Sequence, residues 1–233
     1  MKPVKPVNPM TQPEAAARLR GLYAITPEDP LLPRLSTLVE AALQGGVRLL
    51  QYRNKTAPAP LRRAQAAEML RLCHAHDALL IINDDLPLAL ELNADGVHLG
   101  RDDHGADIAV ARAALGPGKI LGISCYADPA RAAAAAQAGA SYVAFGSLYP
   151  SPTKPQAPPA PLALLGEARR CGLPVAAIGG ITLDNAPATI AAGADMLAVI
   201  SDLFDAADIT ARARAYRALF TSFHSQRGSH ESQ

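Results

Sequence analysis

Three polar side chains alternate along one short segment of the sequence: Gln51, Arg53 and Lys55. Successive side chains of a β-strand point to opposite faces, so residues two apart would face the same way. Two cations and an amide on one side would suit a diphosphate, because the guanidinium fork pairs with phosphate oxygens and the ammonium adds a point charge. The competing interpretation is a strand end that faces solvent.

Carboxylates follow two later apolar segments. Asn83, Asp84 and Asp85 come after one of them, and Asp102 and Asp103 come after the next. Asp85 precedes Leu-Pro and is typical of a helix N-cap, whereas Asp102 is typical of a surface charge. Asp84 and Asp103 would be placed to share one hard cation, since Mg²⁺ binds one or two carboxylates together with phosphate oxygens of a substrate.

A second anion site is indicated nearer the C-terminus. Gly179-Gly180 follows one apolar run, and Ile200-Ser201 ends the last one. Glycine lets backbone N–H groups approach a phosphate, although a tight turn would select the same residues.

A loop rich in proline separates two of the apolar runs. Ser151, Thr153 and Lys154 lie in it, between Pro150 and Pro161. A connection of this length is more often functional than idle, and it could close over a ligand. A surface loop with a solvated lysine is the alternative.

Three further residues lie at or within strands. Ser124 ends an apolar run, and no Ser-His-Asp arrangement is apparent. The adjoining Cys125 has no histidine next to it in the sequence and is expected to be structural. His98 lies inside another run, where a lone histidine is more often a packed core residue than a ligand.

Eight short apolar runs position these residues. A segment of helical length follows almost every run. The runs are Leu22–Thr26, Val47–Tyr52, Ala78–Ile82, Gly96–Leu99, Ile120–Ser124, Tyr142–Phe145, Val175–Ile178 and Met196–Ile200. Continuous apolar runs indicate strands buried on both faces, and their alternation with helices predicts a parallel sheet. Gly46, Asn93, Gly139 and Gly193 are expected to cap helices at a spacing of about two βα units.

This repeat favours an α/β fold with a single (β/α)₈ TIM barrel over an open doubly wound sheet. The active site of such a barrel lies at the C-terminal ends of its strands. The chain has 233 residues, close to the roughly 250 that one barrel uses. We expect a disordered lead over residues 1–18, the barrel over 19–221 and a flexible tail over 222–233.

Composition excludes several classes of partner. The formal net charge of +1 provides no broad field for nucleic acid or an anionic membrane. No apolar run reaches the roughly 18 residues of a membrane span. The three cysteines are far apart, which indicates neither a zinc site nor a disulfide framework and fits a reducing, cytoplasmic compartment. The sequence leaves a homo-oligomer open.

Together, the segments resemble the thiamine-phosphate synthase family, in the family's order, from about residue 21 to 204. The matching segments are Tyr-Ala-Ile-Thr from 23, Gln-Tyr-Arg-Asn-Lys from 51, Asn-Asp-Asp from 83, Asp-Gly-Val-His-Leu-Gly from 95, Gly-Ile-Ser from 122, Ser-Pro-Thr-Lys from 151 and Ile-Gly-Gly-Ile from 178. The resemblance implies a transferase that joins hydroxymethylpyrimidine diphosphate to a thiazole phosphate and releases pyrophosphate, with Mg²⁺ as cofactor and small phosphorylated molecules as partners.

The resemblance also implies roles for individual residues. The diphosphate would be held by Gln51, Arg53 and Lys55, with Asn83 helping to place that substrate. Asp84 and Asp103 would bind Mg²⁺. Ser124 and Lys154 would contact the pyrimidine substrate or its leaving group, so the catalytic residues would be Arg53, Lys55, Ser124 and Lys154. The thiazole phosphate would be seated by Ser151, Thr153, a glycine of the pair Gly179-Gly180, Ile200 and Ser201.

Two residues depart from the family's pattern. Ser151 replaces a threonine but keeps its hydroxyl, and Tyr126 stands where a histidine is frequent. Three other functions remain open at this point: a thiazole tautomerase of similar fold, another phosphate-binding barrel such as a sugar-phosphate isomerase, and a non-catalytic binder of thiamine precursors. A tautomerase would need a base but no diphosphate seat. A binder would have no reason to keep Asp84, Asp103 and Lys154.

Overall fold

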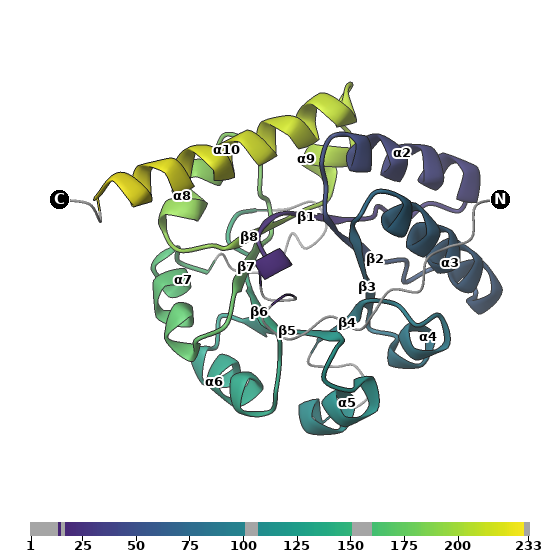
Figure 1. The fold of residues 1–233 in the computed structure, drawn as a ribbon, viewed down its shortest axis with the longest axis horizontal. Helices are drawn as coiled ribbons and strands as arrows, with labels where there is room; N and C mark the ends of the chain where they lie inside the picture. The colour runs from purple at the N-terminus through teal and green to yellow at the C-terminus, as the bar shows by residue number, and fades with distance from the viewer. Residues whose placement is uncertain (1–13, 15–16, 101–106, 151–159, 231–233) are drawn as a thin grey trace.

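The computed structural model describes residue 14 and residues 17–100, 107–150 and 160–230, with side chains described up to residue 222. Eight parallel strands close into a barrel in sequence order, and helices surround it (Figure 1). The strands are β1 (Gly21–Ile25), β2 (Leu49–Tyr52), β3 (Leu79–Asn83), β4 (Gly96–Leu99), β5 (Ile120–Tyr126), β6 (Tyr142–Phe145), β7 (Val175–Ile178) and β8 (Met196–Val199).

All eight predicted strands are therefore confirmed. β8 pairs with β1 as well as with β7, which closes the sheet and excludes the open alternative.

The connections between strands are helical. The helices are α2 (Leu32–Gln44), α3 (Ala59–Ala75), α4 (Leu86–Glu91), α5 (Ile108–Leu115), α6 (Pro129–Gln137), α7 (Ala163–Ala168) with the 3₁₀ turn η1 (Arg169–Cys171), α8 (Ala186–Ala191), α9 (Ser201–Phe204) and α10 (Ile209–His230). Aspartates 85, 107 and 128 cap α4, α5 and α6 through their side chains, each accepting a backbone N–H of the first turn. The expected left-handed residues Gly46, Asn93, Gly139 and Gly193 all have positive φ.

The last helix extends past one expected boundary. α10 runs to His230, whereas the sequence analysis ended the barrel at residue 221 and expected a flexible tail beyond it. A helix already formed adds a backbone hydrogen bond for each residue it fixes, so extending it costs little, even through polar residues. α10 lies along the barrel beside α2 and α8 (Figure 1).

The apolar residues form two separate clusters. The outer one lies between strands and helices and includes Leu50, Val97 and Val143. The inner one fills the barrel and contains Tyr23, Leu49, Ile81 and other residues that alternate with the outer set, as the period of two requires. Leu19, two residues before β1, is 1% exposed and packs into the inner cluster.

The packing inside the barrel also requires a glycine at position 122. His98, Gly122 and Tyr142 are register partners across β4, β5 and β6. A Cβ atom at Gly122 would overlap the ring and hydroxyl of Tyr142. Glycine therefore lets the large Tyr142 ring lie inside the barrel, stacked beside His98 with 5.6 Å between ring centroids.

Among the described residues, no helix has the length and apolar character needed to span a membrane.

Candidate active site

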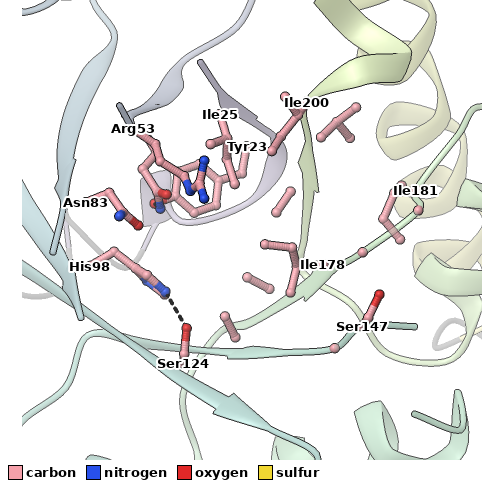
Figure 2. Close-up of a pocket in the computed structure, with 18 of the residues that line it drawn as sticks. Tyr23, Ile25, Arg53, Asn83, His98, Ser124, Ser147, Ile178, Ile181 and Ile200 are labelled. Atoms are coloured by element: carbon pink, nitrogen blue, oxygen red, sulfur yellow. Dashed lines mark hydrogen bonds between the residues drawn. The ribbon is translucent and has the colours of Figure 1, made fainter. Parts of the chain in front are cut away.

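A cavity of about 380 Å³ opens at the C-terminal ends of the strands (Figure 2). Its volume is typical of sites for small molecules. Every strand, or the loop directly after it, contributes to the wall. Ten of the residues predicted for the site line this cavity: Gln51, Arg53, Lys55, Asn83, Asp84, Ser124, Gly179, Gly180, Ile200 and Ser201. The other four, Asp103, Ser151, Thr153 and Lys154, lie outside the described residues.

The predicted cationic side of the pocket is present, and Arg53 is held in place from both ends. Its backbone N–H donates to Thr26 Oγ1 at 2.9 Å, and its guanidinium pairs with Glu28 at 2.8 Å. The second carboxylate oxygen of Glu28 accepts from the hydroxyl of Thr56 at 2.9 Å. The β1–α2 loop therefore fixes where the guanidinium lies, and the sequence analysis assigned no role to that loop.

A buried polar cluster supports the same loop from behind. Gln65 of α3 is fully buried, and its Oε1 accepts from Tyr52 at 2.8 Å and from Asn54 at 3.0 Å. Gln65 Nε2 donates to the carbonyl of Asp29 at 2.7 Å. Asn54, which is part of the Gln-Tyr-Arg-Asn-Lys segment, thus positions its neighbours and does not itself line the pocket.

Lys55 and the predicted metal ligand Asp84 lie next to each other. Lys55 Nζ is 2.8 Å from Asp84 Oδ2, and Asn83 Nδ2 donates to the same oxygen at 2.6 Å. Asp84 has a φ of 61°, a left-handed conformation that is costly for a residue other than glycine and is common at functional sites.

The neighbouring Asp85 instead caps α4, as the alternative interpretation required. Among the residues the structure describes, no three His, Cys, Asp or Glu side chains form a metal site by themselves.

The Gly179-Gly180 segment forms a tight turn on the other side of the pocket. Both glycines have positive φ, 98° and 61°. A Cβ at Gly180 would overlap the Pro150 carbonyl and lie 2.8 Å from Tyr149 Cβ. Asn185 Nδ2 donates to the Gly180 carbonyl at 2.9 Å, so the turn is fixed from α8. The turn interpretation is therefore confirmed, and phosphate binding remains a prediction.

The floor of the pocket is apolar and made of small residues. Ala144, Ala176 and Ala198 point inward from β6, β7 and β8, beside Ile25 and Ile178. Small side chains at the ends of three adjacent strands leave room for a flat ring above the inner cluster.

A line of five polar side chains crosses the barrel, and all of them except Tyr142 line the pocket. Gln51 Nε2 donates to Tyr23 Oη at 2.7 Å, and Tyr23 Oη is 2.7 Å from Tyr142 Oη. His98 Nδ1 lies 2.9 Å from Tyr142 Oη, and His98 Nε2 lies 2.8 Å from Ser124 Oγ (Figure 2 shows this last bond). Burial lowers the pKa of His98 to about 4 and raises the pKa of both tyrosines, so the line is neutral.

His98 is thus a packed core residue, as predicted, and it also lines the pocket. The sequence analysis missed Tyr23 and Tyr142. No signal in the sequence set them apart, because both lie inside nearly continuous apolar runs.

Comparisons with known proteins agree with this geometry. The family model described as thiamine monophosphate synthase matches residues 22–203. The thiamine-phosphate synthase of Methylobacillus flagellatus is 57% identical over 202 residues, which cover 87% of this chain and 96% of that relative. The corresponding protein of Aromatoleum aromaticum is 56% identical over 204 residues, covering 87% of this chain and 97% of that relative.

The chain is also similar to solved structures. Thiamine phosphate pyrophosphorylase from Pyrococcus furiosus superposes with a TM-score of 0.76 at 33% sequence identity, covering 88% of this chain and 97% of that one. A 3-hexulose-6-phosphate synthase shares the fold at 20% identity and a TM-score of 0.65. The family model and the two relatives together span nearly the whole barrel, and on that basis the chain belongs to the thiamine monophosphate synthase family.

Proposed function

We propose that this chain is a Mg²⁺-dependent, cytoplasmic transferase that joins 4-amino-2-methyl-5-hydroxymethylpyrimidine diphosphate to 4-methyl-5-(2-phosphoethyl)thiazole, giving thiamine phosphate and pyrophosphate. The observation that carries the proposal is one cavity with two different sides. Arg53 and Asn83 lie on one side of it, and Ser147 and Ile181, next to the glycine turn, lie on the other (Figure 2). A reaction between two phosphorylated molecules needs two such seats, with room for reaction between them.

The diphosphate belongs on the cationic side. Arg53 offers a planar fork and Lys55 a compact ammonium, and both line the cavity. Their charges are matched by ion pairs with Glu28 and Asp84, respectively. A diphosphate would therefore compete with these two carboxylates for Arg53 and Lys55. A divalent cation that bound Asp84 would release Lys55 for the diphosphate.

The thiazole phosphate belongs at the turn and the end of β8. Gly179 and Gly180 line the cavity with positive φ and no side chain, so their backbone can approach a phosphate, and Ser201 adds a hydroxyl. Ser151, Thr153 and Lys154, outside the described residues, are proposed to complete this seat and to cover the leaving group, as the family resemblance implies.

The bond changes then follow from the placement. The ring nitrogen of the thiazole attacks the methylene carbon of the pyrimidine with its lone pair, and a C–N bond forms. The C–O bond to the diphosphate breaks, and its electron pair remains on the departing oxygen. The nitrogen carries no proton to lose, so no general base is required. Arg53, Lys55 and Lys154 stabilise the charge that grows on the leaving group.

The donor set fits a magnesium ion. Asp84 lines the cavity as a carboxylate that already holds a cation, the Lys55 ammonium, at 2.8 Å. Mg²⁺ characteristically takes one or two carboxylates and completes its shell with substrate phosphate and water. Asp84 and Asp103 would hold the ion, whose chemistry is to neutralise the departing diphosphate.

The decisive experiment measures pyrophosphate release and thiamine phosphate formation from the purified chain. We expect both products in equal amounts, and only when both substrates are present with Mg²⁺. A thiazole tautomerase would instead convert an isomer of the thiazole phosphate without releasing pyrophosphate, and a non-catalytic binder would retain the substrates unchanged. Either result would refute the proposed function.

A further inference from the structure

The donor and the acceptor can be assigned in each hydrogen bond of the polar line that crosses the barrel. This line contains four hydrogen bonds of 2.7–2.9 Å between five side chains that line the pocket or lie directly below it. Each hydroxyl has one proton, and a neutral imidazole has one as well. Counting these protons decides which atom donates in each bond.

The count begins at Gln51, whose Nε2 donates to Tyr23 Oη. If Tyr142 also donated to Tyr23, the Tyr23 proton would have no acceptor among the described residues, and Tyr23 is only 1% exposed. A buried hydroxyl proton without an acceptor is unfavourable. Tyr23 therefore donates to Tyr142, and the Tyr23 hydroxyl proton has an acceptor.

The same count fixes the tautomer of the histidine. Tyr142 Oη accepts from Tyr23, so its own proton goes to His98 Nδ1, 2.9 Å away. Nδ1 is then an acceptor, and the single proton of the neutral ring lies on Nε2. Nε2 lies 2.8 Å from Ser124 Oγ and donates to it.

We propose that His98 is a positioning residue, which donates from Nε2 to Ser124 and thereby leaves the Ser124 hydroxyl proton to a substrate atom in the pocket. Ser124 is anchored independently, since Arg131 Nε donates to its carbonyl at 2.7 Å. With the backbone held by Arg131 and one lone pair of Oγ used by His98, the proton is directed into the cavity. The histidine acts through the serine and does not itself touch the reacting atoms.

The direction of the line selects the chemistry of the group that it faces. Ser124 presents a donor, so the substrate atom beside it must be an acceptor, such as a phosphate oxygen or an unprotonated ring nitrogen. This step rests on the proposed function, in which the diphosphate supplies such oxygens. A bond to a leaving-group oxygen would strengthen as negative charge grows on that oxygen.

Three features of the fold serve this arrangement. Gly122 lies between His98 and Tyr142 in the register and leaves space for the Tyr142 hydroxyl. Tyr23 meets Tyr142 edge to face, with 5.8 Å between ring centroids, which brings the two hydroxyls together. The line crosses the barrel from β2 to β5, so distant strands determine the orientation of one hydroxyl.

The first test measures the tautomer directly. The wild-type chain, labelled with ¹⁵N in its histidines, is examined by NMR at neutral pH, and the His98 signals are identified by their absence in His98→Gln. We expect Nε2 to carry the proton and Nδ1 to be bare. Tyr142→Phe should shift the Nδ1 signal, whereas His76→Gln, a change at the end of α3, should leave both signals unchanged. A proton on Nδ1 would mean that Ser124 donates to the histidine and would overturn the proposal.

The second test measures whether His98 acts through Ser124. We expect His98→Leu to lower turnover about tenfold, the size of one hydrogen bond, and to have no further effect when Ser124 is already alanine. His98→Gln should restore much of the loss, because its amide nitrogen can occupy the place of Nε2. Independent losses in the double variant, or wild-type turnover in His98→Leu, would overturn the proposal. Absence of turnover in the wild type would refute the proposed function instead, and the tautomer would still decide this inference.

Discussion

Replacing Arg53 by alanine separates its contribution to the reaction from its contribution to the fold. The Arg53 side chain is 21% exposed, lines the pocket and forms an ion pair with Glu28, whose side chain is 31% exposed. Pairs of this kind contribute about 0–1 kcal/mol to stability. For a chain of this size, 1 kcal/mol corresponds to about 2–4 °C in Tm, so Arg53→Ala should lower Tm by no more than about 4 °C.

The expected loss of activity is much larger. Removing one fixed charge partner of a developing anion costs about 10²–10³ in rate, or about 2.7–4 kcal/mol of barrier. Arg53→Lys should recover only part of it, because the ammonium keeps the charge but lacks the fork that binds two phosphate oxygens.

The assay is single-turnover pyrophosphate release, with thermal unfolding measured on the same samples. Arg63→Ala is the matched control, because Arg63 forms an ion pair with Glu91 on the outer surface and is 61% exposed. We expect Arg63→Ala to turn over like the wild type. If Arg53→Ala stayed within about threefold of the wild type, well short of the expected loss, the cationic seat would be wrongly placed. If it unfolded at the assay temperature, Arg53 would be structural.

Three further predictions concern other parts of the molecule. Excess chelator should abolish turnover, and Asp84→Asn should weaken Mn²⁺ binding measured by electron paramagnetic resonance while the far-ultraviolet circular dichroism spectrum is unchanged. Gly180→Val should raise the KM for the thiazole phosphate more than that for the pyrimidine substrate, since a side chain there would overlap Pro150. His74 forms a hydrogen bond with Asp95 that raises the pKa of His74 above 6.5. The stabilisation of the folded state by this pair is therefore full below pH 6.5 and is lost as pH rises through the raised pKa. The difference in unfolding free energy between wild type and His74→Gln, measured with urea from about pH 5.5 to about pH 8.5, should therefore fall.

The barrel could be predicted because each strand is a nearly continuous apolar run, which is typical only of strands buried on both faces. The polar residues at strand ends could be predicted for a related reason. Gln51, Asn83 and Ser124 interrupt or end apolar runs, and parallel strands bring such interruptions to the same end of the barrel.

What the sequence did not show is how these residues are held. Tyr23 and Tyr142 lie within apolar runs and are indistinguishable from core aromatics until the register places their hydroxyls 2.7 Å apart. Gln65 and Asn54 are eleven positions apart, on a helix and a loop, and no pattern in the sequence links them. The extent of α10 could not be predicted because polar composition says little about whether an existing helix continues.

The separation of the apolar residues into two clusters has a consequence for how this barrel tolerates change. Val97 and Val143 of the outer cluster pack between strands and helices and do not line the cavity. Ala144 and Ala198 face the cavity and lie in the inner cluster. A methyl group gained or lost at either alanine would therefore reshape the space for a substrate ring while every helix keeps its own contacts. A substitution at Ala144 or Ala198 would therefore change the space for a substrate without disturbing the contacts that Val97 and Val143 make in the outer cluster.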